Sequence, residues 1–228
     1  MTTKPSHPKE TNPAPTIQRF VLGDFQTNCY IITQGEPEPG KPCWAIDCGY
    51  NPGSMLDAID EQELRVDALI LTHAHADHIA GVSELRSRHP ECPILLHEAE
   101  EDWLNDPMLN LSANIGLSVT APNATRLLHG GEALQLQDMT WHVRHTPGHS
   151  PGGISLIHTE SGTAMVGDTL FAGSVGRSDF PGSSMDTLTR SIHTQLYTLD
   201  PKTVCCPGHG PATTIEREMA TNPFVPGE

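Results

Sequence analysis

The feature that most constrains this chain is a histidine-rich segment at residues 73–78, which reads His-Ala-His-Ala-Asp-His. It follows an apolar run, 66–71, that has the length and composition of a buried strand. Alternate residues of an extended segment point the same way. The pattern therefore predicts that His73 and His75 converge on one metal ion.

Asp77 and His78 lie where the chain turns from that strand into an expected helix, 79–89. Their side chains would then point away from the first pair and face a second ion nearby. Four metal-capable side chains within six residues, separated by small alanines, predict half of a two-metal site. The alternative is a histidine-rich surface loop that binds metal adventitiously, and the motif alone leaves it open.

Three further segments each place one metal-capable side chain in a turn after an expected strand. Pro and Gly fix sharp turns around His149 and His209, while Asp168 follows an apolar run. Catalytic groups of layered α/β enzymes gather at the carboxyl ends of strands, so these segments are expected to meet. The expected ligands of one ion are His73, His75 and His149, and those of the other are Asp77, His78 and His209, with Asp168 between the two.

Ligands of this kind limit both the metal and the chemistry. Seven imidazoles and carboxylates without a thiolate suit zinc, and also iron or manganese, because such ligands discriminate poorly among divalent ions. An open position at each ion indicates a catalytic rather than a structural site. Two cations lower the pKa of a bridging water and supply a hydroxide, so no nucleophilic Ser or Cys is needed. Asp77 is the expected catalytic residue, placed to orient this nucleophile or to take its proton.

The rest of the chain predicts an α/β fold, because short apolar strands alternate with helices. One domain is expected at 16–213, preceded by a disordered lead, 1–15, and followed by a C-terminal tail, 214–228. Residues 105–123 show no period and predict an irregular insertion that either shapes substrate access or fills the surface. The expected strands are 17–22, 28–33, 43–47, 66–71, 94–97, 133–136, 140–145, 154–158, 163–167 and 203–206, and the other expected helices are 53–64, 98–104 and 186–199.

Composition excludes several classes of partner. A net charge of −15 argues against nucleic acid, which requires a basic face. No apolar stretch reaches the roughly 18 residues of a membrane-spanning helix. The N-terminus lacks the apolar segment of a secretory signal, so a cytoplasmic protein with six reduced cysteines in packing roles is expected.

Four histidines outside the motifs are not expected to bind metal: His89, His97, His142 and His158.

The order of the motifs resembles that of the metallo-β-lactamase superfamily over almost the whole chain. The motifs are HxHxDH at 73–78, TPGH at 146–149, GDTLF at 167–171 and PGHG at 207–210. The resemblance implies a four-layered αββα sandwich in a single domain, with the metals at one edge. The stretch 167–182 is most similar to the compact bacterial relatives of glyoxalase II, the hydroxyacylglutathione hydrolases. By that resemblance, the expected reaction is hydrolysis of a small-molecule acyl thioester, such as S-lactoylglutathione, by a metal-bound hydroxide.

The chain departs from the longer glyoxalase II enzymes at its C-terminal end. Those enzymes carry a helical domain whose basic residues help to hold glutathione, whereas here Arg217 is the only basic residue after His209. Arg177 is a candidate substrate-binding residue, because it lies in a motif loop and carries a charge that would pair with a carboxylate. An ion pair with Asp179 is its alternative role.

Two other functions remain open from the sequence. A persulfide dioxygenase also resembles the chain in HxHxDH and in Gly-Arg-Ser-Asp-Phe at 176–180. Such enzymes use one iron held by two His and one Asp, which His75 or His73 would supply with His149 and Asp168. A non-catalytic metal-binding module would normally lack some ligands, and none is missing. A β-lactamase is disfavoured, because Asp168 occupies the position where many of those enzymes have Cys. The sequence leaves the oligomeric state open.

Overall fold

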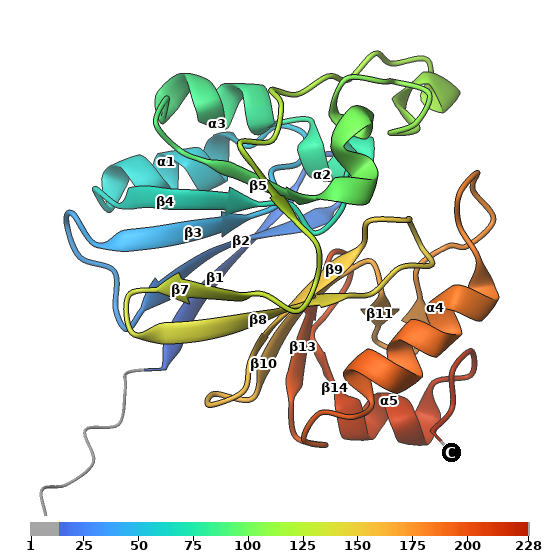
Figure 1. Cartoon of the computed structure of the whole chain (residues 1–228). Coiled ribbons are helices and arrows are strands. Elements are labelled where there is room, and N and C mark those ends of the chain that lie inside the picture. The colour runs from blue at the N-terminus through green and yellow to red at the C-terminus, as the bar shows by residue number, and fades with distance from the viewer. Residues whose placement is uncertain (1–13, 228) are drawn as a thin grey trace, which may run out of the picture.

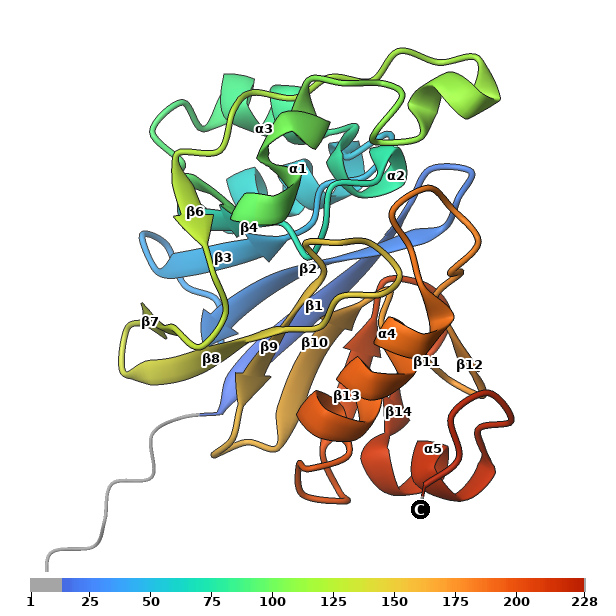
Figure 2. The same cartoon turned by 45° about the vertical axis from the view of Figure 1, so that its right-hand side comes forward.

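A computed structural model describes residues 14–227 of the chain. Two sheets pack face to face and helices cover the outer face of each, as Figure 1 and Figure 2 show from two sides. This arrangement confirms the predicted αββα sandwich. Most of the lead predicted for 1–15 lies outside the described residues, and its last residue, Pro15, begins the first strand.

The first sheet has six strands in the order in which they occur in the sequence. The first three strands pair antiparallel, and the others continue the sheet in parallel. Its strands are β1 (Pro15–Leu22), β2 (Thr27–Gln34), β3 (Pro42–Ile46), β4 (Arg65–Ile70), β5 (Ile94–His97) and β6 (Arg126–Leu128).

The second sheet also has six strands, in the order β14-β13-β10-β9-β8-β7. The pairs within it are antiparallel except for β10 and β13, which run in parallel. Its strands are β7 (Ala133–Leu136), β8 (Met139–His145), β9 (Ile154–His158), β10 (Thr163–Gly167), β13 (Val204–Pro207) and β14 (Thr213–Thr214). A small hairpin, β11 (Leu170–Phe171) with β12 (Ser174–Val175), stands apart from both sheets.

The helices are short and fall into two groups. On the first sheet lie α1 (Gly53–Glu61), α2 (Ala76–Ile79), α3 (Val82–Arg88) and the 3₁₀ segments η1 (Glu98–Leu104) and η2 (Ser112–Ile115). On the second sheet lie α4 (Met185–Ser191), its π-helical continuation η3 (Ile192–Leu196) and α5 (Ile215–Thr221). Within residues 14–227, none of these helices has both the length and the apolar character needed to cross a lipid bilayer.

Three hydrophobic cores correspond to the three interfaces of the sandwich. Strand β2 shows how the chain builds two of them at once, because alternate residues of a strand face opposite sides. Cys29 and Ile31 pack into the core under the first helical layer, whereas Tyr30 and Ile32 pack into the core between the sheets. A third core lies between the second sheet and its helices, and includes Leu188 of α4. With both faces covered, β2 is continuously buried, as is typical of central strands.

Four strands present the motif segments at one edge of the sandwich. Strand β4 ends just before Thr72, and β8, β10 and β13 run in the same direction in the second sheet. Their carboxyl ends lead into the segments that contain His149, Asp168 and His209. The motif segments were predicted to lie together, and the directions of these strands explain why they do.

The helix predicted at 79–89 is wrong as a single element. The structure has two helices there, α2 and α3, which are separated at Ala80 and Gly81. Gly81 packs against the loop after β3 so closely that a Cβ on it would lie 2.5 Å from the carbonyl oxygen of Gly49. The chain bends at this contact, and the helix that carries Asp77 in its first turn is only four residues long.

The C-terminal segment, predicted as a tail at 214–228, also differs. Helix α5 begins directly after β14, and the side chain of Thr214 accepts a hydrogen bond from the amide of Arg217 to cap it. Ile215 and Val225 are buried in the third core. This segment is therefore an integral part of the outer helical layer.

Candidate metal centre

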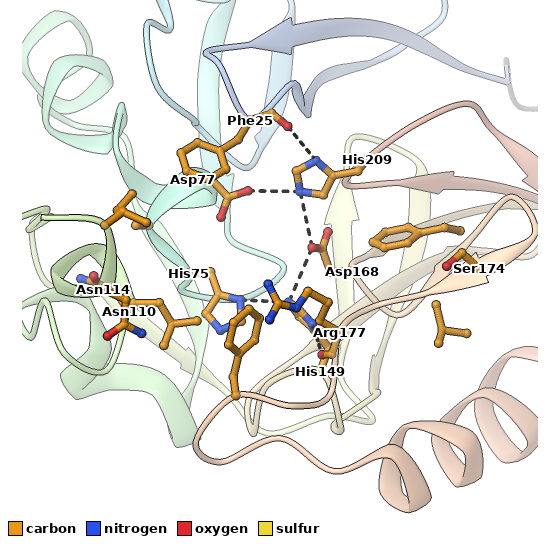
Figure 3. Close-up of a pocket in the computed structure, with 16 residues that line it drawn as sticks. Phe25, His75, Asp77, Asn110, Asn114, His149, Asp168, Ser174, Arg177 and His209 are labelled. Carbon is orange, nitrogen blue, oxygen red and sulfur yellow. Dashed lines mark hydrogen bonds and ion pairs between the residues drawn. The ribbon is translucent and has the colours of Figure 1, made fainter. Parts of the chain in front are cut away.

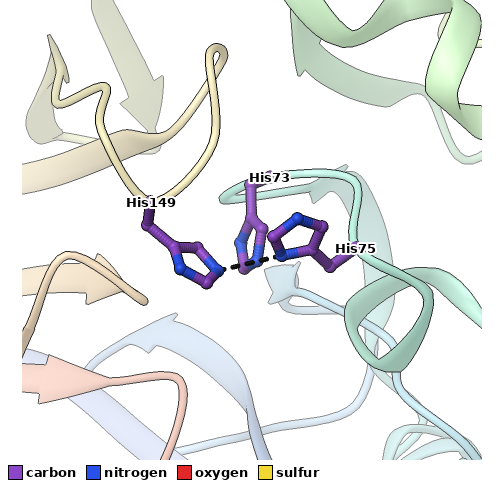
Figure 4. Close-up of side chains that lie close together, drawn as sticks. All are labelled: His73, His75 and His149. Atoms are coloured by element: carbon purple, nitrogen blue, oxygen red, sulfur yellow. Dashed lines mark hydrogen bonds between the residues drawn. The ribbon is translucent and has the colours of Figure 1, made fainter. Parts of the chain in front are cut away.

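Three histidines meet between the sheets at the end of β4. Figure 4 shows His73 and His75 approaching His149 from the opposite loop, with Nδ1 of His75 2.9 Å from Nε2 of His149. The ring of His73 lies edge-on to both, at centroid distances of 4.7 and 4.9 Å. One ligand nitrogen from each of the three residues lies within 4.8 Å of the others, which is the geometry of a metal-binding group.

A second group lies beside the first. Nε2 of His209 is 3.1 Å from Oδ2 of Asp77, and Nε2 of His78 is 3.5 Å from the same oxygen. These three side chains also bring one ligand atom each to within 4.8 Å of the others. Asp77 and His78 were predicted to point away from the first pair, but the ring of His78 lies 4.1 Å from that of His73, and His73, His78 and Asp168 form a further group of ligand atoms within 4.8 Å of one another.

Asp168 lies between the two groups. Its Oδ2 is 3.5 Å from Nε2 of both His149 and His209, and its Oδ1 is 3.4 Å from Nε2 of His78. In Figure 3 its carboxylate is joined to a histidine of each group. The structure thus brings together all seven side chains predicted as ligands.

Several buried nitrogen and oxygen atoms of the cluster lack hydrogen-bond partners, and this makes the cluster suitable for binding a pair of divalent cations. Nε2 of His73, Nε2 of His78 and Oδ1 of Asp168 are buried and have no hydrogen-bond partner among the described residues. Burying such atoms unpaired costs free energy, whereas a cation satisfies lone pairs of both kinds. The unpaired atoms therefore point to divalent-metal binding at this position.

The pKa values of the three-histidine group and of both carboxylates suit this role, since metal ligands must be deprotonated. Burial lowers the pKa of His73 well below its usual value and that of His75 to about 3, so both imidazoles are neutral. Burial alone would raise the pKa of Asp77 and of Asp168, but the nearby charge of His78 holds both below the ordinary range. Burial alone would lower the pKa of His78 and of His209, but the carboxylates of Asp77 and Asp168 beside them raise both, so neutral imidazoles are favoured in the three-histidine group only.

Comparison with protein families identifies the fold. Residues 22–209 match the family described as the metallo-beta-lactamase superfamily. The chain belongs to this superfamily. Among its relatives, the "Probable metallo-hydrolase YqgX" of Bacillus subtilis is 36% identical over 211 residues, covering 92% of this chain and 97% of the relative. The "Hydroxyacylglutathione hydrolase GloC" of Haemophilus influenzae is 34% identical over 215 residues, covering 92% and 97%.

Solved structures agree with this assignment to the metallo-β-lactamase superfamily. The crystal structure of BLEG-1, described as a B3 metallo-beta-lactamase, has a TM-score of 0.86 and 35% sequence identity, covering 92% of this chain and 99% of that one. The crystal structure of TTHA1623 in a di-iron-bound form has a TM-score of 0.80 and 34% identity, covering 91% and 100%. The family and the cluster together make this chain a metallo-hydrolase-type protein with a divalent-metal site.

Asp47 supports the second group in this metallo-β-lactamase fold. Its Oδ2 accepts a hydrogen bond from Nδ1 of His78 at 2.8 Å, which leaves Nε2 of His78 facing the cluster. The same carboxylate accepts hydrogen bonds from the amide and hydroxyl of Thr72, at 2.7 and 2.8 Å. Such outer contacts fix the orientation and tautomer of a ligating histidine. Asp47 was not among the predicted site residues, although it follows an apolar strand as Asp168 does.

Glu100 supports the three-histidine group and was also missed. The residue is fully buried in η1, and its Oε2 accepts a hydrogen bond from the amide of Ala74, between His73 and His75. Its Oε1 accepts one from the amide of Gly152, in the loop that carries His149. One carboxylate therefore joins the two loops from which these histidines come.

Backbone carbonyls orient two other histidines. Nδ1 of His149 donates to the carbonyl oxygen of Arg177 at 2.7 Å, and Nδ1 of His209 donates to that of Phe25 at 3.2 Å. In both residues Nε2 is the nitrogen that faces the cluster. Gly176, beside Arg177, admits no side chain, because a Cβ there would overlap the carbonyl oxygen of Asp168.

The remaining predicted residues lie outside the cluster. Arg177 forms a two-pronged ion pair with Asp179, at 3.0 and 2.9 Å, and its guanidinium lies 4.2 Å above the ring of Phe180. This is the alternative role predicted for Arg177, and the residue also lines the pocket described next. None of the four histidines predicted as non-ligands belongs to the metal-binding groups found among the described residues: His89, His97, His142 and His158.

A cavity of about 570 Å³ opens onto the metal-binding groups. His75, Asp77 and Asp168 lie at its base, and Figure 3 shows Asn110 and Asn114 on the opposite side from Ser174. The side with the asparagines belongs to the insertion predicted at 105–123, which thus forms a wall of the pocket. Of the two roles predicted for that segment, the structure supports shaping of access to the site.

Proposed function

We propose that this protein is a dinuclear-metal hydrolase that cleaves acyl thioesters, as enzymes of the glyoxalase II type do. The observation that carries the proposal is the set of seven side chains, with its unpaired buried atoms, at the base of an open pocket. In this assignment one ion is held by His73, His75 and His149, the other by Asp77, His78 and His209, and Asp168 lies between them.

Zinc is the metal we propose, with iron and manganese as alternatives. The donor set contains imidazole and carboxylate only, which discriminates poorly among these ions. When bound, such a pair of ions lowers the pKa of a water molecule toward neutrality and polarises the substrate carbonyl. The protein then needs no side-chain nucleophile.

Asp77 is the catalytic residue that we assign. It lines the pocket, and the hydroxyl of Thr27 donates to its Oδ2 at 3.0 Å, which holds the carboxylate in place. Burial alone would raise its pKa, but the nearby charge of His78 lowers it, which keeps the carboxylate ionised and able to accept a hydrogen bond from a water molecule that bound ions would hold there. A carboxylate with so low a pKa stores a proton poorly, and we therefore assign it the task of orienting the water.

A small-molecule acyl thioester is the proposed substrate class. The support is the 34% identity to a hydroxyacylglutathione hydrolase over nearly the full length of both chains. A thioester also suits the chemistry, since the departing thiolate is a good leaving group. S-lactoylglutathione is the first substrate to test, followed by acyl derivatives of coenzyme A.

The test begins with metal analysis of protein purified without added metal, followed by rate measurements on metal-loaded protein. We expect about two ions per chain and hydrolysis of at least one thioester. Oxygen consumption with glutathione persulfide, at one iron per chain, would instead establish the dioxygenase. Hydrolysis of a β-lactam without thioester turnover would establish a β-lactamase, and either result would overturn the proposal.

A further inference from the structure

The pocket wall contributed by the insertion carries two apolar side chains and is anchored by hydrogen bonds. Leu111 and Ile115 are its apolar residues, and Asn110 and Asn114 also line the pocket there. The buried amide of Asn110 donates to the carbonyl oxygens of Trp103 and Val119, at 3.0 and 2.9 Å, so it spans the base of the insertion. The carbonyl oxygen of Asn110 also accepts from the amide of Ala76, beside Asp77. The wall is therefore fixed relative to the metal ligands.

Leu111 holds an unusual backbone conformation at this wall. Its φ is +68°, a left-handed conformation that is costly for a leucine and that glycine or asparagine would adopt more easily. A strained residue persists where the surrounding structure holds it, and such residues gather at ligand-binding sites. The partly buried side chain of Leu111 lines the pocket.

The opposite wall also carries apolar side chains, and away from the metal-binding groups the described lining has a single lysine or arginine. Phe171, Ser174 and Val175 of the β11–β12 hairpin line the pocket, as does Phe25. Of the lining residues within 14–227, Arg177 alone is a lysine or arginine, and it is already paired with Asp179. A net charge of −15 on the chain adds a further barrier to anionic ligands.

We propose that the pocket selects thioesters whose acyl and thiol portions are uncharged and apolar, over glutathione thioesters with their two carboxylates. Leu111 and Ile115 are the specificity-determining side chains. This inference rests on the proposed thioesterase function and narrows its substrate class. Apolar groups gain from burial between the two walls, whereas a carboxylate on the thiol portion, away from the metal-binding groups, loses water there without gaining an unpaired lysine or arginine.

The first experiment compares thioesters that share an acyl group. We expect kcat/KM for S-butanoyl-N-acetylcysteamine, which is neutral, to exceed that for S-butanoylglutathione by about tenfold. In a series of N-acetylcysteamine thioesters, kcat/KM should rise from acetyl to hexanoyl. If wild-type protein prefers the glutathione thioester, the inference fails while the thioesterase function stands.

Two variants test whether the pocket wall formed by the insertion determines the substrate preference. Ile115 and Leu117 are two residues apart and similarly exposed, at 49% and 46%, but only Ile115 lines the pocket. Ile115→Arg should raise the preference for the glutathione thioester about fivefold, because it adds a cation to the wall. Leu117→Arg adds the same charge outside the pocket and should leave the preference unchanged. Equal effects of both variants would contradict a specific role of the wall.

Binding measurements keep the inference testable if no thioester is hydrolysed. The probes are two stable thioethers, S-butyl-N-acetylcysteamine and S-butylglutathione, titrated calorimetrically into metal-loaded protein. Tighter binding of the neutral thioether, weakened in Leu111→Gly, supports the inference even if the thioesterase proposal fails. Relief of the left-handed strain should keep the melting temperature of this variant at or above that of the wild type. Tighter binding of S-butylglutathione would overturn the inference.

Discussion

The carboxylate of Glu100 accepts a hydrogen bond from the backbone amide of Ala74 at 2.6 Å. Ala74 separates two of the three clustered histidines, and the other oxygen of Glu100 binds the amide of Gly152 in the loop of the third. A single buried group thus sets the distance between two loops that are far apart in the sequence. It does so without facing the metal-binding groups directly.

We predict that Glu100→Gln weakens metal binding to the three-histidine group by roughly 10–100-fold. The new amide NH₂ would face one of the two backbone donors, which removes a hydrogen bond at a cost of about 1–3 kcal/mol in stability. Zinc affinity is measured by competition with a chelating dye. Glu98→Gln is the matched control, since Glu98 lies exposed in the same segment and forms an ion pair with His129. Equal affinities in both variants would contradict a positioning role.

Asp47→Asn should weaken the second group instead. It replaces the carboxylate that accepts from Nδ1 of His78, and the expected loss of affinity for one ion of the pair is again roughly 10–100-fold. Metal analysis after dialysis against a weak chelator should find one ion per chain where the wild type keeps two. Asp67→Asn, in an exposed ion pair with Arg65, provides the control. Retention of both ions by Asp47→Asn would refute this assignment.

Removal of a proposed ligand should abolish turnover while preserving the fold. His149→Ala and Asp168→Ala are each expected to reduce kcat by more than the roughly 100-fold that a supporting residue costs. Circular dichroism should show unchanged secondary structure, because both side chains lie at a strand end rather than in a hydrophobic core. A rate close to that of the wild type in either variant would contradict the ligand assignment.

Gly176→Ala should lower stability and weaken metal binding by displacing the backbone near Asp168. A methyl group there would overlap the carbonyl oxygen of Asp168, so the segment carrying this carboxylate must shift. We expect a loss of about 1–3 kcal/mol in the free energy of unfolding, together with weaker metal binding. Gly53→Ala at the start of α1 has open space around it and is the control. The prediction is wrong if both variants unfold at the same denaturant concentration.

The cysteines should resist alkylation in the folded protein. All six are free thiols, and burial raises the pKa of Cys206, the least buried of them, to about 11. A raised pKa keeps the thiol protonated at pH 8, and only the thiolate reacts. Mass spectrometry after iodoacetamide treatment should therefore find little labelling in native protein and six labels after denaturation. Rapid native labelling of any cysteine would contradict its packing role.

The candidate ligands could be predicted from the sequence because each lies in a short local pattern. An apolar strand followed by a polar turn places His73, His149, Asp168 and His209 at strand ends, and the common direction of the strands brings the ends together. The alternation of side chains in an extended segment was enough to predict that His73 and His75 lie together, and their ring centroids are 4.7 Å apart. The αββα layers followed from the same alternation of strands and helices.

Contacts between distant segments could not be predicted in this way. Glu100 lies among other acidic residues of η1, and nothing local distinguishes it from its exposed neighbours. Its partners, Ala74 and Gly152, are 26 and 52 residues away. The break between α2 and α3 likewise depends on Gly81 meeting the loop after β3. In each case, tertiary packing decides what local sequence leaves open.

The seven clustered side chains come from both halves of the sandwich, so the cluster connects the two sheets. Four come from the turn after β4 in the first sheet, and the others from turns of the second. Any movement of one sheet relative to the other would change the distances between the clustered side chains. Metal ions bound there would link the two sheets. Metal binding should therefore reduce motion along the whole interface between the sheets, including that of backbone amides remote from the pocket.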